Sequence, residues 1–325
     1  MRTPSLLLVT IILGFSTLSH AQTKLSDGSV VIFASENEAR GILTTRDDFI
    51  QRLSPFDRSA RMKTDKDVSE ADFLKFVGNS ALAWRDQERR KIEAALQSIQ
   101  PYLAEISVPL PEKLYVIKTS GNEEGGASYT RTNAIVIPKI KLKEDTREIQ
   151  KSLCHELFHI ATRHNLALQE RLYQTIGFRK CNEIEFPSML IARKITNPDA
   201  PKNDHYISLQ VGGKPVSAVP ILLAVRERYD VNRGGEFFDY LQFRLLLVSR
   251  SGERGGVRPL YDGASPRLVN VQQISGFLEQ VGANTDYIIH PEEILADNFV
   301  LLVLKEQTAR TPEVLNRMRT VLLKK

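Results

Sequence analysis

The chain has 325 residues, of which 42% are hydrophobic and 26% are charged, a composition typical of a globular protein with an ordinary core. Its 44 basic and 39 acidic residues give a formal net charge of +5, but no run of basic residues interleaved with aromatics indicates a nucleic-acid groove. The length allows one large domain or two lobes that share a cleft.

The first 21 residues have the layout of a secretory signal peptide. Arg2 supplies a positive charge, the residues from Leu6 to Phe15 form a short apolar core, and Ala21 ends a plausible cleavage site. An uncleaved anchor is the alternative, but the apolar run is shorter than the roughly 18 residues that a membrane-spanning helix needs. We therefore expect an exported protein, secreted or periplasmic, whose mature chain begins at Gln22 and is not held at a membrane.

The N-terminal third is expected to be extended at first and then helical. Residues 22–66 mix short apolar runs with charged turns, which indicates an extended segment. From Ser69 onward, apolar residues at three- and four-residue spacing predict one long helix that ends near Gln100, before Pro101.

The rest of the chain alternates between strands and helices. In order, the pattern predicts a strand at 114–118, a glycine-rich turn at 121–126, a strand at 127–140, helices at 145–163 and 166–176, an irregular segment at 187–204, strands at 219–225 and 237–248, and helices at 271–281, 291–308 and 312–323. We therefore expect an α+β chain with a signal peptide (1–21), an N-terminal lobe (22–165) and a C-terminal lobe (166–325).

Cys154 and Cys181 are the only two cysteines. In an oxidising compartment they could form one disulfide, which would stabilise the fold by roughly 3 kcal/mol in the chain-entropy model. Two free thiols are the alternative, and the sequence does not decide between them.

The helix expected at 145–163 carries the motif His155-Glu156-Leu157-Phe158-His159. Because residues four apart lie on one face of a helix, both imidazoles can bind one Zn²⁺ ion if a third ligand comes from elsewhere. Glu156 lies beside that face, where its carboxylate can take a proton from water and pass it to a leaving amine. A coincidental match on an ordinary helix is the alternative.

Two candidates for the third ligand fit poorly. A histidine ten residues after the first would complete a metzincin-type site, but Asn165 occupies that position. Glu183 is at a reasonable distance along the chain, but its segment, which continues to Pro187, does not have a helical pattern.

Glu293 is the candidate that we favour. It lies in the first turn of a helix that begins at Pro291, a residue suited to the first helical position. Asp297 follows one turn later, where its carboxylate can accept a hydrogen bond from a ligating histidine. The alternative is an acidic first turn attracted by the helix dipole, a role that we assign to Glu292, because Ala296 leaves it without a partner one turn on.

HExxH on one helix and Glu293-x-x-x-Asp297 on a later helix resemble the gluzincins, the thermolysin-like branch of zinc metallopeptidases. The resemblance implies that Glu293 is the third zinc ligand and that Asp297 braces His155. It also implies a two-lobed zincin-like fold with an antiparallel edge strand before the HExxH helix and a helical C-terminal part. In that family the edge strand pairs with the substrate backbone, and here it corresponds to Ala127, Ser128, Tyr129 and Thr130. A purely structural sheet edge is the alternative.

Two features depart from the gluzincin pattern. The step from His159 to Glu293 is much longer than in the minimal pattern, which implies an inserted lobe or a different third ligand. The Tyr or His that stabilises the tetrahedral intermediate, a group whose loss typically costs ~10²–10³ in rate, has no firm equivalent. The best candidates are His205 and Tyr206, followed by Tyr240, Tyr287 and His290.

We therefore expect a zinc metallopeptidase that acts on a peptide or protein substrate, with zinc held by His155, His159 and Glu293 and with Glu156 as the general base. A catalytically inactive zinc-binding exported protein, either a pseudo-enzyme or a binding module, is the alternative. A fortuitous motif that binds no metal tightly is a third interpretation. The sequence indicates neither substrate preference nor oligomeric state.

Overall fold

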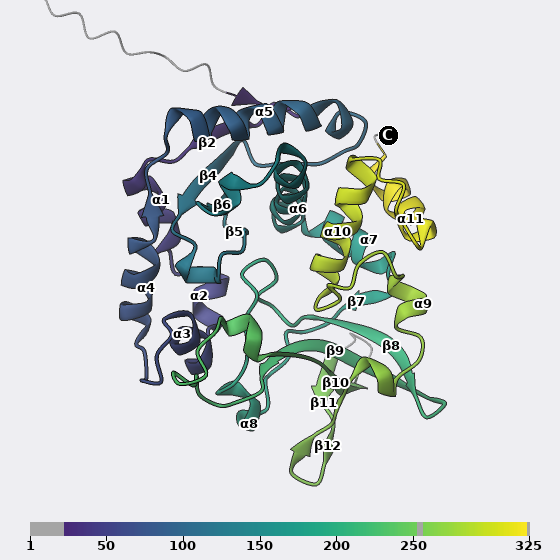
Figure 1. Cartoon of the computed structure of the whole chain (residues 1–325). Coiled ribbons are helices and arrows are strands. Elements are labelled where there is room, and N and C mark those ends of the chain that lie inside the picture. The colour runs from purple at the N-terminus through teal and green to yellow at the C-terminus, as the bar shows by residue number, and fades with distance from the viewer. Residues whose placement is uncertain (1–22, 252–255, 324–325) are drawn as a thin grey trace, which may run out of the picture.

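The computed structural model describes residues 23–251 and 256–323, so the predicted signal peptide lies outside the described residues. Two six-stranded sheets and the helices that cover them account for most of this part of the chain, which confirms the α+β class (Figure 1). Among the described residues, no helix combines the length and the apolar character needed to cross a membrane.

The first sheet has the strand order β1-β2-β4-β6-β5, with β3 paired to the end of β4. Its strands are β1 (Thr23–Lys24), β2 (Val30–Phe33), β3 (Ala81–Leu82), β4 (Lys113–Thr119), β5 (Tyr129–Arg131) and β6 (Ala134–Pro138). Strands β2, β4 and β6 are parallel, whereas β5 runs antiparallel to β6 and forms an edge. An antiparallel edge strand is therefore present before the HExxH helix, as predicted.

The single strand expected at 127–140 is a hairpin of β5 and β6. Its turn is at Thr132 and Asn133, and Thr132 has a positive φ of 49°. Positive φ at the first central residue is typical of tight hairpin turns, for which Asn is a favoured residue. The sequence prediction was wrong here because apolar residues lie on both sides of this short turn and hide it.

The segment expected to be extended at 22–66 includes three short helices. It contains α1 (Glu36–Leu43), α2 (Asp48–Arg52) and α3 (Pro55–Arg61). Each helix begins with a short polar side chain that caps a backbone N–H, namely Ser35, Asp47 and Ser54. These caps could have predicted the helices, but each helix is too short for its apolar periodicity to be visible.

The long helix expected from Ser69 to Gln100 is two helices, α4 (Glu70–Asn79) and α5 (Asp86–Leu103). Between them β3 pairs with β4, and the Trp84 ring packs edge-on against Phe33 at 5.2 Å. The break is hidden in the sequence because Ala81 and Trp84, which lie between the two helices, are three residues apart, a spacing that also occurs on one face of a helix. Pro101 lies inside the last turn of α5 and does not end it.

The second sheet is antiparallel and has the order β11-β10-β9-β8-β7, with β14 on β10. It comprises β7 (Phe178–Lys180), β8 (His205–Val211), β9 (Lys214–Ala224), β10 (Leu241–Ser251), β11 (Gly256–Pro259) and β14 (Leu268–Val269), and β12 (Tyr261–Asp262) pairs separately with β13 (Ser265–Pro266). Residues 237–240, predicted as strand, form a 3-10 helix, η3 (Phe237–Tyr240), and the helix predicted at 271–281 is reduced to η4 (Val271–Gln273) and α9 (Leu278–Val281). The remaining short elements are η1 (Asn122–Glu124), η2 (Lys141–Lys143) and α8 (Ser188–Ile191).

Helix α6 (Thr146–His164) lies at the centre of the molecule, in contact with α5 and with α10 (Pro291–Val303) (Figure 1). Helices α7 (Leu166–Gln174) and α11 (Pro312–Leu322) pack beside α10, and apolar residues of all these helices share one core. The predicted lobe boundary at 165/166 falls between α6 and α7.

Cys154, which is buried on α6, and Cys181, which is half-buried, are both free thiols.

Candidate metal centre

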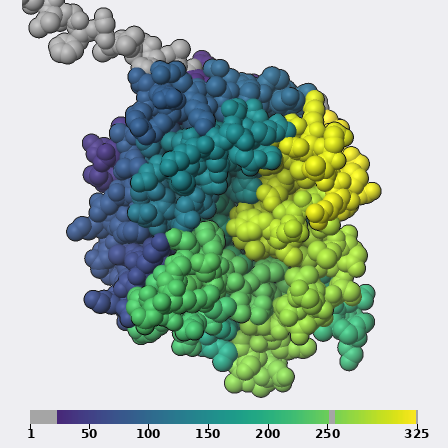
Figure 2. All heavy atoms as spheres, viewed as in Figure 1, coloured from purple at the N-terminus to yellow at the C-terminus, as the bar shows by residue number. Residues whose placement is uncertain are grey.

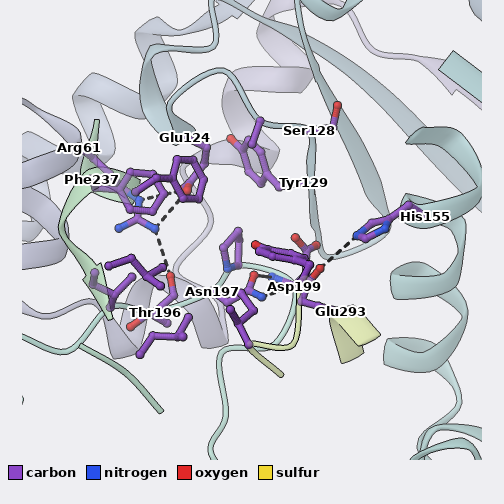
Figure 3. A pocket seen from close by; sticks show the side chains of 18 residues that line it. Arg61, Glu124, Ser128, Tyr129, His155, Thr196, Asn197, Asp199, Phe237 and Glu293 are labelled. Carbon is purple, nitrogen blue, oxygen red and sulfur yellow. Dashed lines mark hydrogen bonds and ion pairs between the residues drawn. The ribbon is translucent and has the colours of Figure 1, made fainter. Parts of the chain in front are cut away.

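The contact between α6 and α10 brings together three side chains of metal-ligand type. His155 and His159 extend from one face of α6, with ring centroids 4.7 Å apart, and Glu293 comes from the first turn of α10. Glu293 Oε2 lies 3.1 Å from His155 Nε2 and 3.6 Å from His159 Nε2. Figure 3 shows His155 and Glu293 meeting at one end of a cavity.

The other nitrogen of each imidazole faces a carboxylate. Asp297 Oδ1 lies 3.0 Å from His155 Nδ1, the pairing that the sequence predicted. Glu292 lies in the first turn of α10, as expected of a residue attracted by the helix dipole, and its Oε1 also lies 3.0 Å from His159 Nδ1, a contact that the sequence did not predict. With Nδ1 donating its proton to a carboxylate, Nε2 of each ring offers the lone pair that a metal needs.

Glu292 is the more deeply embedded of these two outer carboxylates. It is 1% exposed and accepts hydrogen bonds from the Thr162 and Tyr173 hydroxyls in addition to the one from His159. Burial opposes ionisation, but these hydrogen bonds and the His159 charge hold the pKa of Glu292 below its usual value. This network was not predictable from sequence patterns, because its members come from three helices.

The three candidate ligands have the spacing that zinc requires. Ligand atoms about 2.0–2.1 Å from a tetrahedral ion lie about 3.3–3.4 Å from one another, and the distances of 3.1 Å and 3.6 Å bracket that value. His159 Nε2 is buried and has no hydrogen-bond partner among the described residues, which is unfavourable for a polar atom unless a ligand binds it. Two imidazoles and one carboxylate are a donor set that suits zinc.

The electrostatics of the cluster also favour a bound cation. Burial alone would lower the pKa of His155, but hydrogen bonds to Asp297 and Glu293 raise it to about 10. The pKa of His159 is likewise raised, with burial opposed by the charges of Asp199 and Glu293. The acidic groups around the two imidazoles therefore favour positive charge at this position.

Glu156 lies next to the three candidate ligands. Its side chain is buried, and Oε2 has no hydrogen-bond partner in the part of the chain that the structure describes. Ligand atoms of Glu156, His159 and Asp199 all lie within 4.8 Å of one another. Burial and the charge of Asp199 raise the pKa of Glu156 to about 8. A carboxylate in this position can exchange a proton with a group bound at the centre.

The segment 195–199 contacts the site and was not predicted to do so. Asn197 Nδ2 donates to Glu293 Oε1 at 2.6 Å, which fixes the orientation of the carboxylate that faces the histidines. Asp199 Oδ1 accepts from the Thr130 main-chain N–H at 2.8 Å and from the Thr130 hydroxyl. The sequence Asn197-Pro198-Asp199 indicates a fixed turn, but nothing in it indicates which part of the molecule the turn contacts.

Two adjoining cavities flank the candidate ligands, and Ala127, Ser128 and His155 line both. One, of about 240 Å³, extends past Glu293 and is largely apolar. The other, of about 540 Å³, extends past Glu156 and Asp297 and is lined by charged side chains, namely Lys141, Glu144, Glu148, Lys151 and Glu306. The surface is hollowed where the teal, green and yellow-green parts of the chain meet (Figure 2).

The four residues predicted to contact substrate differ in whether a bound peptide could reach them. Tyr129 and Thr130 are both buried, and both pair with β6. The outward N–H of Thr130 is bonded to Asp199. Of the predicted set, Ala127 and Ser128 therefore lie in the open part of the cleft.

Four of the five candidate transition-state donors lie elsewhere. His205 packs on Tyr173 at 4.5 Å and pairs with Asp204, behind the Glu292 network, while Tyr206 lies under the Arg250 guanidinium in the second sheet. Tyr240 is buried in another apolar cluster, and His290 caps the start of α10. Neither of the two leading candidates, His205 and Tyr206, lines a cavity with the three candidate ligands. Only Tyr287 lines a cavity together with His155 and Glu293.

No protein-family model, curated protein or solved structure matches this chain. The assignment of function therefore rests on the chemistry and geometry of the site.

Proposed function

We propose that this protein is an exported zinc-dependent peptidase with a gluzincin-like site and a zincin-like fold. One observation carries the proposal. The Nδ1 atoms of His155 and His159 both face outer carboxylates, while their Nε2 atoms face Glu293 Oε2. An ordinary structural helix has no need of imidazoles oriented in this way.

His155, His159 and Glu293 would hold the ion. A bound zinc ion supplies a Lewis acid that polarises the scissile carbonyl and lowers the pKa of water. Glu156 would take a proton from the attacking water and pass it to the leaving amine, since its carboxylate lies within 4.8 Å of the ligand atom of His159 and is not part of the His155, His159 and Glu293 set. Asn197 keeps Glu293 in place through its 2.6 Å hydrogen bond.

Tyr287 is the best candidate for a hydrogen-bond donor to the developing oxyanion. It lines the same cavity as His155 and Glu293 and is partly exposed there. Burial of one side of the ring and the charges of Glu293 and Asp199 raise the pKa of its hydroxyl, so the proton that a donor needs is retained at neutral pH. The substrate backbone would lie along Ser128, on the open side of the edge strand.

The test compares wild-type protein with a Glu156→Gln variant, both loaded with zinc, on a library of unstructured peptides. We expect the wild type to cleave and the variant to retain zinc but to lose ~10²–10⁴ in kcat/KM. Glu313→Gln is the control, because Glu313 is exposed in the first turn of α11 and lines neither cavity, and it should cleave normally. Absence of cleavage by the wild type, or equal rates for wild type and Glu156→Gln, would contradict the proposal.

One observation favours the alternative of a catalytically inactive zinc-binding protein. Asp199 lies close to His159 and Glu156, where its carboxylate could occupy the position that a catalytic site leaves for substrate. If so, Asp199→Ala would gain peptidase activity that the wild type lacks. If the site is already open, the same variant would show no such gain.

A further inference from the structure

The smaller cavity has an apolar wall opposite the candidate ligands. Phe237 and Phe238 of η3 lie with ring centroids 4.0 Å apart, and Leu222 of β9 and Leu241 of β10 line the same space. In Figure 3, His155 and Glu293 lie at one end of this cavity and Phe237 lies at the other, beside Arg61 and Glu124. The second sheet therefore contributes a wall to the candidate site.

The charged residues of this wall form ion pairs with one another. The Arg61 guanidinium is 0% exposed and pairs with Asp57 at 2.6 Å and with Glu124 at 2.7 Å. It also donates to the Thr196 carbonyl at 3.1 Å and lies 4.2 Å from the centre of the Phe237 ring. Because these partners satisfy the guanidinium, the wall offers ring and aliphatic surface to a ligand and no free charge.

Phe238 is positioned by its neighbours even though it is 39% exposed. A Cβ at Gly125 would lie 3.1 Å from the Phe238 ring, so this ring packs directly on the glycine backbone. Gly125 has a φ of +58°, a conformation that glycine adopts readily. The exposed face of Phe238 is thus a built part of the cavity wall.

The cavity has room for a large side chain. An apolar cavity of roughly 150 Å³ holds a benzene molecule, and this one measures about 240 Å³. The cavity on the other side of the ligands is lined by charged residues such as Lys141, Glu144 and Lys151. The smaller cavity adds the adjacent Phe237 and Phe238 rings to this volume, so burial of an apolar side chain is favoured there.

We propose that this cavity is a specificity pocket for a large apolar side chain, aromatic or branched, of a peptide whose backbone lies along Ser128. The inference rests on the proposed peptidase function, because it takes the ligand to be a peptide. It adds a substrate class: peptides with a large apolar residue at one fixed position, on the Glu293 side of the scissile bond.

The test measures binding, so that it does not depend on turnover. Zinc-loaded Glu156→Gln protein is titrated calorimetrically with acetylated and amidated hexapeptides of Ala and Ser that carry one Phe at successive positions, and with the same peptides carrying Asp. We expect one Phe position to bind about 10- to 100-fold more tightly than the Asp peptide. Adding Phe238→Ala should remove most of that difference. Adding Tyr261→Ala should not, because Tyr261 is an aromatic residue with 49% exposure that lies outside the cavity.

Equal affinity for the Phe and Asp peptides, no measurable binding of either, or a preference that survives Phe238→Ala would overturn the proposed pocket. Cleavage by the wild-type protein is measured separately. Binding selectivity without any cleavage would support the pocket and contradict the proposed function. Cleavage without side-chain selectivity would support the proposed peptidase function and contradict the pocket.

Discussion

The two histidines of the motif make the same contact in different surroundings. His159 is fully buried and its outer carboxylate, Glu292, is 1% exposed, whereas His155 is 19% exposed and Asp297 is 33% exposed. In addition to its contact with His155, Asp297 accepts a hydrogen bond from the Thr285 hydroxyl. The buried half of the site is thus part of the core, and the exposed half lies in the cleft. Loss of the outer carboxylate should therefore destabilise the protein more on the His159 side than on the His155 side.

The largest effect should come from removing the buried carboxylate. Glu292→Ala leaves the His159 ring and the Tyr173 hydroxyl without their acceptor, which should destabilise the metal-free protein by about 3–5 kcal/mol. Asp297→Ala exposes His155 to water and should cost less than about 1 kcal/mol. Zinc affinity should fall by about 10- to 100-fold in both. Denaturant unfolding and competitive zinc titration measure the two quantities, and equal stability losses would contradict the comparison.

A pH dependence should come from His290, which lies behind Glu292. Burial lowers the pKa of His290 to about 4, and its Nδ1 accepts a hydrogen bond from the Glu292 main-chain N–H. As the pH falls below about 6.5, the unfolded chain binds a proton that the folded chain does not bind until about pH 4. Stability should therefore fall by about 3 kcal/mol as pH decreases through this window.

His290→Asn keeps a side chain that can cap the helix but cannot titrate. Chemical unfolding of both proteins at pH 7, 5.5 and 4 should show a smaller loss of stability in the variant. Parallel curves for the two proteins would show that His290 does not carry the effect.

The smallest effects should come from the hydroxyl groups that support the two carboxylates. Tyr173→Phe removes a hydrogen bond to a buried charged group and should cost about 1.5–3 kcal/mol. Thr285→Val removes the equivalent bond to Asp297 and should cost less than about 0.5 kcal/mol, since the Asp297 side chain is 33% exposed and water can replace the hydroxyl there. Equal losses in thermal or denaturant unfolding would indicate that burial does not separate the two sides.

The same contrast explains what the sequence could predict. His155 and His159 lie one turn apart on one helix, and Glu293 and Asp297 lie one turn apart on another, so the arrangement within each pair was predictable from helical periodicity. The contact between the two pairs was expected from the resemblance to gluzincins. The contacts of Glu292 were missed because its partners, Thr162 and Tyr173, are not one turn away on its own helix.

Asn197 and Asp199 were missed for a related reason. They lie in an irregular segment whose position is fixed by tertiary contacts to Arg163 and Thr130.

The success of the secondary-structure prediction also depended on how strongly each element is patterned. Long periodic elements such as α6 and the strand β4 were predicted closely, whereas α1 to α3 were missed because they are short and marked mainly by their caps.

Metal content tests the central claim most directly. The mature chain, purified without a His tag or chelator, is offered zinc, freed of excess and measured by plasma mass spectrometry. We expect about one zinc ion per chain, retained in Glu156→Gln and lost in His159→Ala and in Glu293→Ala. No bound metal in the wild-type chain, or zinc retained when His159 and Glu293 are both replaced, would contradict the assignment of this cluster as a metal centre.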